Sequence, residues 1–111
     1  LYHSKLNDIQ ELIMPPAPGS EDNRFDTFQN FEIRCEKRDE LKTFLADNGI
    51  GTLIQWGGKA IHQIDGLNFD SKENLPVTEK LFKKCMLLPM NSLMTLDDAE
   101  YVTQIIRKFY S

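Results

Sequence analysis

The sequence predicts a small α/β (α+β) domain in which a three-stranded sheet is packed with helices. Segments with alternating apolar residues or short apolar runs, typical of strands, are separated by segments with helical spacing of apolar residues. Glycine or proline marks most of the boundaries between them. The predicted order is β-α-β-loop-α-β-α, preceded by the end of a helix that arrives from another domain. Such an order builds a sheet layered with helices.

Size and charge narrow the class of protein. The chain has 111 residues, which is the size of one domain, and 41% of them are hydrophobic. Its net charge of -4 and the lack of a Lys/Arg stripe argue against nucleic acid and anionic membranes as partners. No apolar run approaches the roughly 18 residues of a membrane span, and no signal peptide is visible.

The first 24 residues differ from the rest of the chain. Apolar residues there follow a rough helical period: Leu1, Leu6, Ile9, Leu12 and Ile13. Residues 14–23 end any helix, because proline lacks an amide donor and glycine tolerates positive φ. We therefore divide the chain into residues 1–24, a helix end and Pro-rich linker, and residues 25–111, a small domain.

A strand and a helix open the small domain. Residues 31–36 alternate, so Phe31, Ile33 and Cys35 are expected to face the core while Glu32 and Arg34 face water. Residues 38–49 have the apolar spacing of a helix that Gly49 ends. A second strand is predicted over residues 50–56, because Ile50, Thr52, Ile54 and Trp56 occupy every second position. Residues 63–74 are predicted to form a polar loop.

Helix, strand and helix complete the chain. Residues 75–84 predict a helix with Pro76 in its first turn. The apolar run 85–88 suits a buried third strand, although its period alone does not distinguish it from a helix end. Thr95 and Asp98 resemble a capping box that begins the last helix, whose apolar face is wide.

Several local patterns together resemble one family. They are Arg38-Asp-Glu-Leu with a helix ending at Asn48-Gly-Ile-Gly-Thr52, the runs 75–81 and 87–90, the last helix over 95–110, and Tyr2 with Leu6. In this order and with these gaps, they are similar to the C-terminal small domain of the DegT/StrS family of sugar-nucleotide aminotransferases, which depend on pyridoxal phosphate. The match runs over essentially all 111 residues.

The resemblance implies a function for a larger protein. The whole enzyme would transfer an amino group from an amino acid, with glutamate the expected donor, to a nucleotide-linked keto sugar. The cofactor-binding lysine would lie in a large N-terminal domain, so this chain is expected to hold no catalytic residue, cofactor or metal and to be inactive alone. The intact enzyme is expected to be a cytoplasmic homodimer that serves surface-polysaccharide or deoxyamino-sugar biosynthesis.

The resemblance also points to substrate-binding residues. Many family members carry His-Tyr-Pro where this chain has Gln55-Trp56-Gly57, and a second His where it has His62. We therefore expect Gln55, Trp56, Lys59 and His62 to face the substrate. Gln55 would act as a neutral donor and acceptor instead of an imidazole.

Each of these residues also has a structural interpretation. Trp56 could pack between strand and helix, Lys59 could be solvated, and His62 could be structural. The glycine pair after Trp56 could approach a phosphate or simply form a turn. Cys35 and Cys85 are predicted to be buried free thiols of a protein from a reducing compartment. The alternative is a zinc site that they would form together with His62.

Two other functions are compatible with so small a domain. A free-standing α/β regulatory module that binds a small metabolite fits the compact pattern of capped helices. A sheet domain that binds RNA fits less well, because the chain is acidic and lacks exposed strand aromatics with basic neighbours.

Overall fold

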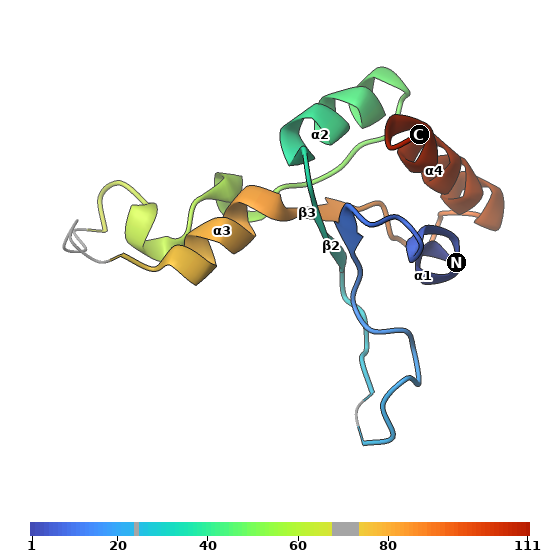
Figure 1. Ribbon diagram of the computed structural model, residues 1–111, viewed down its shortest axis with the longest axis horizontal. Helices are drawn as coiled ribbons and strands as arrows, with labels where there is room; N and C mark the ends of the chain where they lie inside the picture. Colours follow the sequence, from blue (N-terminus) through green and yellow to red (C-terminus); the bar gives the residue numbers. More distant parts are fainter. Residues whose placement is uncertain (24, 68–73) are drawn as a thin grey trace.

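A three-stranded antiparallel sheet lies at the centre of the molecule (Figure 1). The computed structural model describes residues 1–23, 25–67 and 74–111. The strands are β1 (Leu12–Ile13), β2 (Phe31–Cys35) and β3 (Cys85–Leu88), in the order β1-β2-β3. The register pairs Leu12 with Cys35 and Ile33 with Met86. The predicted α+β class with three strands is confirmed.

The helices fall into two groups on either side of the sheet. α1 (Tyr2–Leu6), α2 (Arg38–Asp47) and α4 (Leu96–Phe109) gather around one side, and we call this group with the sheet the helical body (Figure 1). The 3₁₀ turns η1 (Gln55–Gly58) and η2 (Ile61–Gln63) and helix α3 (Pro76–Lys84) form an arm on the other side. The loop between β1 and β2 extends away from both groups. No helix among the described residues is long and apolar enough to span a membrane.

The core lies between the sheet and the helical body. Its largest fully buried side chains come from α1, β2, α2, β3 and α4: Leu6, Ile33, Cys35, Leu41, Leu45, Met86 and Ile106. Full burial of one aliphatic side chain contributes about 1.5–3 kcal/mol. The inward residues of β2 are Ile33 and Cys35, as the alternation predicts, and Phe31 is half-buried at the edge of the core.

The ends of α2 and α4 follow their predicted signals. α2 carries Asp39 and Glu40 in its first turn, and Gly49 follows its end with φ of 75°, a conformation that suits glycine. α4 begins with a complete capping box. The Asp98 amide donates to Thr95 Oγ1 at 3.1 Å, and the Thr95 amide donates to Asp98 Oδ2 at 2.8 Å.

The prediction of a helix over residues 1–13 is wrong beyond Leu6. Leu12 and Ile13 form β1 instead and pair with Cys35 and Arg34 of β2. The Glu36 amide extends this pairing with a 3.0 Å hydrogen bond to the Glu11 carbonyl. Pairing with β2 satisfies backbone groups that two residues could not satisfy alone. The division into residues 1–24 and 25–111 stays a prediction.

The prediction of a strand over residues 50–56 is also wrong. Only Leu53 pairs there, as an isolated antiparallel bridge to Leu87, with N···O distances of 3.3 and 2.8 Å. The chain then turns through Trp56 and Gly57, whose φ values are 54° and 62°. These left-handed conformations end the pairing, and the third strand of the sheet is instead β1, on the opposite edge of β2. Of the predicted loop 63–74, residues 68–73 lie outside the described part of the chain.

Candidate functional site

A groove of about 470 Å³ opens on the face of the sheet turned away from the core. Three segments that are distant in the sequence build it. They are the end of β1 with the prolines that follow, residues 54–56, and the end of α3. Its floor consists of the outward residues of β2 and β3, namely Glu32, Arg34 and Cys85. The two faces of the sheet therefore differ, since one is sealed by helices and the other is open.

The floor combines a carboxylate, a guanidinium and a thiol. The pKa of Cys85 is raised to about 11, chiefly by burial and also by the nearby Glu32 carboxylate, while the positive charges of Arg34 and Arg38 oppose the increase. At neutral pH the thiol is therefore protonated, and it is a poor nucleophile. This arrangement suits binding better than covalent catalysis.

Arg38 fixes the wall that α3 forms. Its Nη1 donates to the carbonyls of Phe82 and Cys85, at 3.1 and 3.2 Å. Its Nε donates to Asp39 at 2.6 Å, and only 10% of its side chain is exposed. Because Lys37 and Arg38 begin α2, these bonds hold the end of α3 against the start of α2. The groove wall is therefore anchored to the helical body.

Two of the four expected substrate-binding residues line the groove. Gln55 is half-buried, and Trp56 stands at the rim with 74% of its surface exposed. The indole therefore does not pack between strand and helix in this structure. Its left-handed backbone is strained by about 1–3 kcal/mol for a residue other than glycine, and such strain is concentrated at functional sites. The substrate contact of both residues stays a prediction.

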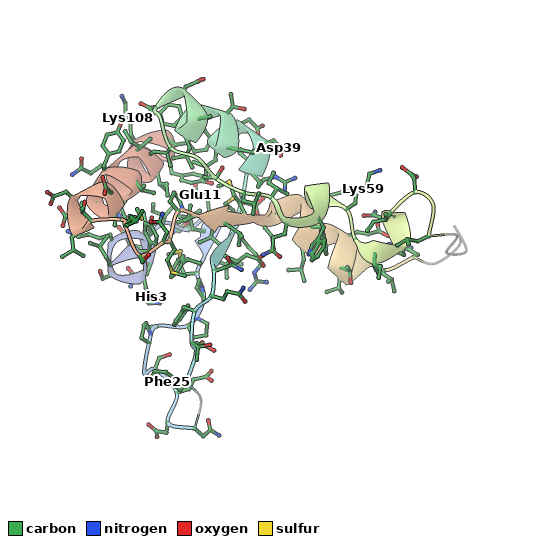
Figure 2. All side chains as sticks on the ribbon, turned by 180° about the vertical axis from the view of Figure 1, so that it is seen from behind. His3, Glu11, Phe25, Asp39, Lys59 and Lys108 are labelled. Carbon is green, nitrogen blue, oxygen red and sulfur yellow. The ribbon has the colours of Figure 1, made fainter. Side chains whose placement is uncertain are left out.

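The other two expected residues lie on the arm and do not line the groove. Lys59 forms a 3.0 Å ion pair with Asp65 in which both side chains are largely exposed (Figure 2). His62 is buried, with Nε2 at 3.0 Å from Glu79 Oε1 on α3. The His62 hydrogen bond lowers the pKa of Glu79. The structural interpretation of His62 is thus supported by its contacts, although Nδ1 has no partner among the described residues.

Comparison with known proteins identifies the family. The sequence model of the DegT/DnrJ/EryC1/StrS aminotransferase family matches residues 1–107. The chain belongs to this family. A crystal structure of a DegT DnrJ EryC1 StrS aminotransferase from Brucella abortus superposes with a TM-score of 0.82 at 27% identity. It covers 99% of this chain and 28% of that protein.

Two curated proteins are also similar to this chain. One is the pleiotropic regulatory protein of Geobacillus stearothermophilus, 34% identical over 85% of this chain and 26% of that protein. The other is the dTDP-3-amino-3,6-dideoxy-alpha-D-galactopyranose transaminase of Aneurinibacillus thermoaerophilus, 22% identical over 83% of this chain and 25% of that protein. The chain thus spans about a quarter of the length of the curated relatives it matches.

The lysines of this chain do not fit the pyridoxal phosphate that the family uses. A Schiff-base lysine requires a desolvated pocket or cationic neighbours. Each lysine in the described part of the chain is exposed or half-buried, and none lines the groove. Lys84, the least exposed of them, contacts Glu36. The chemistry of the cofactor therefore cannot be assigned to these residues.

The thiols do not form a metal site with the histidine. Cys35 is buried and Cys85 half-buried, both are free, and the Cys35 thiol lies 3.5 Å from the Lys84 carbonyl. Within residues 1–23, 25–67 and 74–111, no group of three His, Cys, Asp or Glu side chains could hold a metal ion. The predicted free thiols are confirmed, and Cys85 is less buried than expected because it faces the groove.

Several residues of the groove were not predicted from the sequence. Glu32 and Arg34 were placed on the outer face of their strand, and this is correct, but their position beneath Gln55 required the tertiary structure. Phe82 and the segment 13–16 were likewise not selected. An available signal was a glutamate and an arginine two residues apart on the outer face of one strand.

Proposed function

We propose that this chain is the C-terminal small domain of a pyridoxal-phosphate-dependent aminotransferase. The enzyme transfers an amino group from an amino acid, with glutamate the expected donor, to a nucleotide-linked keto sugar. Its product serves surface-polysaccharide or deoxyamino-sugar biosynthesis. The chain closes one side of the substrate cleft and is inactive alone.

The open groove carries this proposal. It is largely apolar, with a few polar groups, which is the composition of small-molecule sites. It lies on the face of the sheet that the helical body leaves uncovered, and the exposed Trp56 stands at its rim. The family match and the transaminase relative support the assignment of the reaction class.

The residues of this chain would bind and orient the substrate. The cofactor, held by the remainder of the enzyme, supplies an electron sink for amino-group transfer. The amide of Gln55 can both donate to and accept from a sugar hydroxyl or carbonyl without titrating near neutral pH. The indole of Trp56 offers an apolar surface that excludes water and one N–H donor.

The remaining partners follow from the relatives. Because the matched part is about a quarter of each curated relative, a large cofactor-binding domain is the expected neighbour of this chain in the same polypeptide. We propose further that the intact enzyme is a cytoplasmic homodimer. Sedimentation of the intact protein tests the oligomeric state.

Kinetics of the intact protein with Gln55→Ala test the site. With glutamate and a panel of nucleotide-linked keto sugars, kcat/KM for the sugar should fall about tenfold or more on loss of one or two hydrogen bonds. Gln104→Ala, an exposed position on α4, is the matched control and should leave kcat/KM unchanged. Unchanged kcat/KM in Gln55→Ala would remove this residue from the substrate contacts. No amino transfer by the wild type to any sugar would refute the function itself.

A second candidate is a small metabolite-binding regulatory module. The name of the 34% identical relative favours it. This candidate predicts that residues 1–111 alone bind a small metabolite with a saturable isotherm. In calorimetry, the aminotransferase proposal predicts no such binding in the absence of the remaining domain.

A further inference from the structure

The three arginines in the described part of the chain have different surroundings. Arg38 is buried and donates to two carbonyls and a carboxylate. Arg107 donates to both oxygens of Asp8 at 2.6 and 2.8 Å and to the Lys5 carbonyl at 2.8 Å. The guanidinium of the exposed Arg34, by contrast, has no hydrogen bond or ion pair with any described residue. The guanidinium groups of Arg38 and Arg107 hold the fold together, and the guanidinium of Arg34 is available to bind a ligand.

Arg34 lies on the floor of the groove. It pairs with Cys85 across β2 and β3, and both line the groove with Gln55. Glu32, two residues away on the same strand, is the carboxylate among the described residues that line the groove. It forms no ion pair with Arg34, and the Glu32 carboxylate instead acts on the Cys85 thiol. The charge of Arg34 therefore has no counter-ion on the floor.

An unpaired guanidinium in a largely apolar groove is a recognition element for an anion. When a substrate or another domain closes the groove, the charge loses water and requires an opposite charge. The planar guanidinium fork matches carboxylate and phosphate oxygens in two parallel hydrogen bonds. Since the carboxamide of Gln55 lines the same groove, an anionic ligand would meet a donor from the floor and a donor from the wall.

We infer that Arg34 binds an oxyanion group of a substrate, with Gln55 as the adjacent neutral contact. The inference rests on the proposed function, and it deepens that function. Two sources share this chemistry, namely the carboxylate of the amino-acid donor and the phosphates of the nucleotide-linked sugar. Arg34 is a binding and positioning residue, and it takes no part in proton transfer.

The test is Arg34→Gln in the intact enzyme, with kcat/KM measured separately for each substrate. Loss of a charge-assisted pair should lower kcat/KM by about 10- to 100-fold. A loss for the amino acid alone identifies its carboxylate as the ligand, and a loss for the sugar alone identifies its phosphates. Loss for both indicates that both anions use the same contact.

Two further variants separate binding from folding. Arg34→Lys should recover part of the loss, because the charge remains while the fork is absent. Lys108→Gln, on an exposed position of α4 in the helical body, removes a cation far from the groove and should change neither constant (Figure 2). The melting temperature and the Schiff-base absorption band of Arg34→Gln should equal those of the wild type.

Specific results would overturn the inference. If kcat/KM is unchanged for both substrates, Arg34 contacts neither. If the loss comes with a lower melting temperature or a weaker absorption band, Arg34 pairs with a carboxylate of the remaining domain and not with a substrate. Failure of the wild type to transfer an amino group to any sugar would refute both this inference and the proposed function. Normal transfer with normal Arg34→Gln kinetics would refute the inference alone.

Discussion

α3 and α4 precede and follow β3 in the sequence, and both are amphipathic, but they use their apolar residues differently. α4 buries Val102 and Ile106 in the core, together with the polar Thr103. α3 has no buried residue, and Val77 on its apolar face is 73% exposed. The two patterns are equally good predictors of a helix. Only the apolar face of α4 is buried within the described part of this chain.

This difference extends to the two groups of helices. The helical body buries its apolar residues within this chain, whereas the arm leaves apolar residues exposed to a binding partner. The helical body is sealed, with α1 joined to α4 by Arg107 and Asp8. The arm exposes large apolar side chains on all three of its elements, namely Trp56, Ile61 and Val77. Large exposed apolar surface marks binding sites. The open side is therefore where substrate and the remaining polypeptide are expected.

Truncation of one apolar side chain on each helix gives the largest contrast. Ile106→Ala should lower the free energy of unfolding by about 2–5 kcal/mol, because it leaves a cavity in the core. Val77→Ala should change it by less than about 0.5 kcal/mol. Denaturant unfolding of this chain followed by circular dichroism measures both. Equal losses would show that α3 packs as tightly as α4.

The helix starts give a smaller contrast. Thr95→Ala should destabilise the chain by about 1 kcal/mol, because the Asp98 amide loses its side-chain acceptor. α3 begins at Leu75, which makes no capping hydrogen bond, so Leu75→Asp should stabilise α3 by up to about 1 kcal/mol. Amide hydrogen exchange measures each helix separately. If Leu75→Asp does not slow exchange in α3, the start of this helix does not limit its stability.

Acid should affect the two regions through different carboxylates. Hydrogen bonds from Arg107 hold the pKa of Asp8 below its ordinary value of 3.8. A lowered pKa in the folded state stabilises the fold above the ordinary value, and this stabilisation is lost as the pH falls below 3.8. Asp8→Asn should therefore flatten the fall of the melting temperature below pH 4.

Glu79 provides the matched control for this acid effect. Its pKa is also lowered, by His62, but the pair joins η2 to α3 within the arm. Glu79→Gln should leave the acid limb of global unfolding unchanged and affect only hydrogen exchange in the arm. A flattened melting curve in Glu79→Gln would mean that arm and helical body unfold together.

The two thiols report the accessibility of the two sheet faces without a change in stability. Burial raises the pKa of both Cys35 and Cys85 to about 11, so their thiolate fractions are comparable. Cys35 is 1% exposed on the core face, while Cys85 lines the groove. A small alkylating reagent should modify Cys85 first, and Cys35 only on unfolding. Mass spectrometry follows the labelling, and Cys85→Ser should abolish the faster phase.

Local signals predicted a large part of the fold. The alternation of β2, the Gly49 end of α2 and the Thr95 capping box of α4 each depend on residues within a few positions of one another. Of the candidate site, Gln55 and Trp56 were selected and do line the groove. Lys59 and His62 were selected from the same stretch, but contacts with Asp65 and Glu79 hold them elsewhere. No local pattern indicates those partners.

The sequence by itself determined the end of α2, the start of α4 and which residues of β2 turn inward, because period and capping are properties of adjacent residues. Tertiary structure decided which segments pair. The pattern at Leu12 and Ile13 is too short to predict a strand. These residues form one because they pair with β2, more than twenty residues further along the chain. The longer alternation from Ile50 to Trp56 gives only one bridge, because the left-handed turn at Trp56 and Gly57 takes the chain away from β3. The groove is lined both by the segment that follows β1 and by residues 54–56 at this turn, so its residues come together only in the tertiary structure.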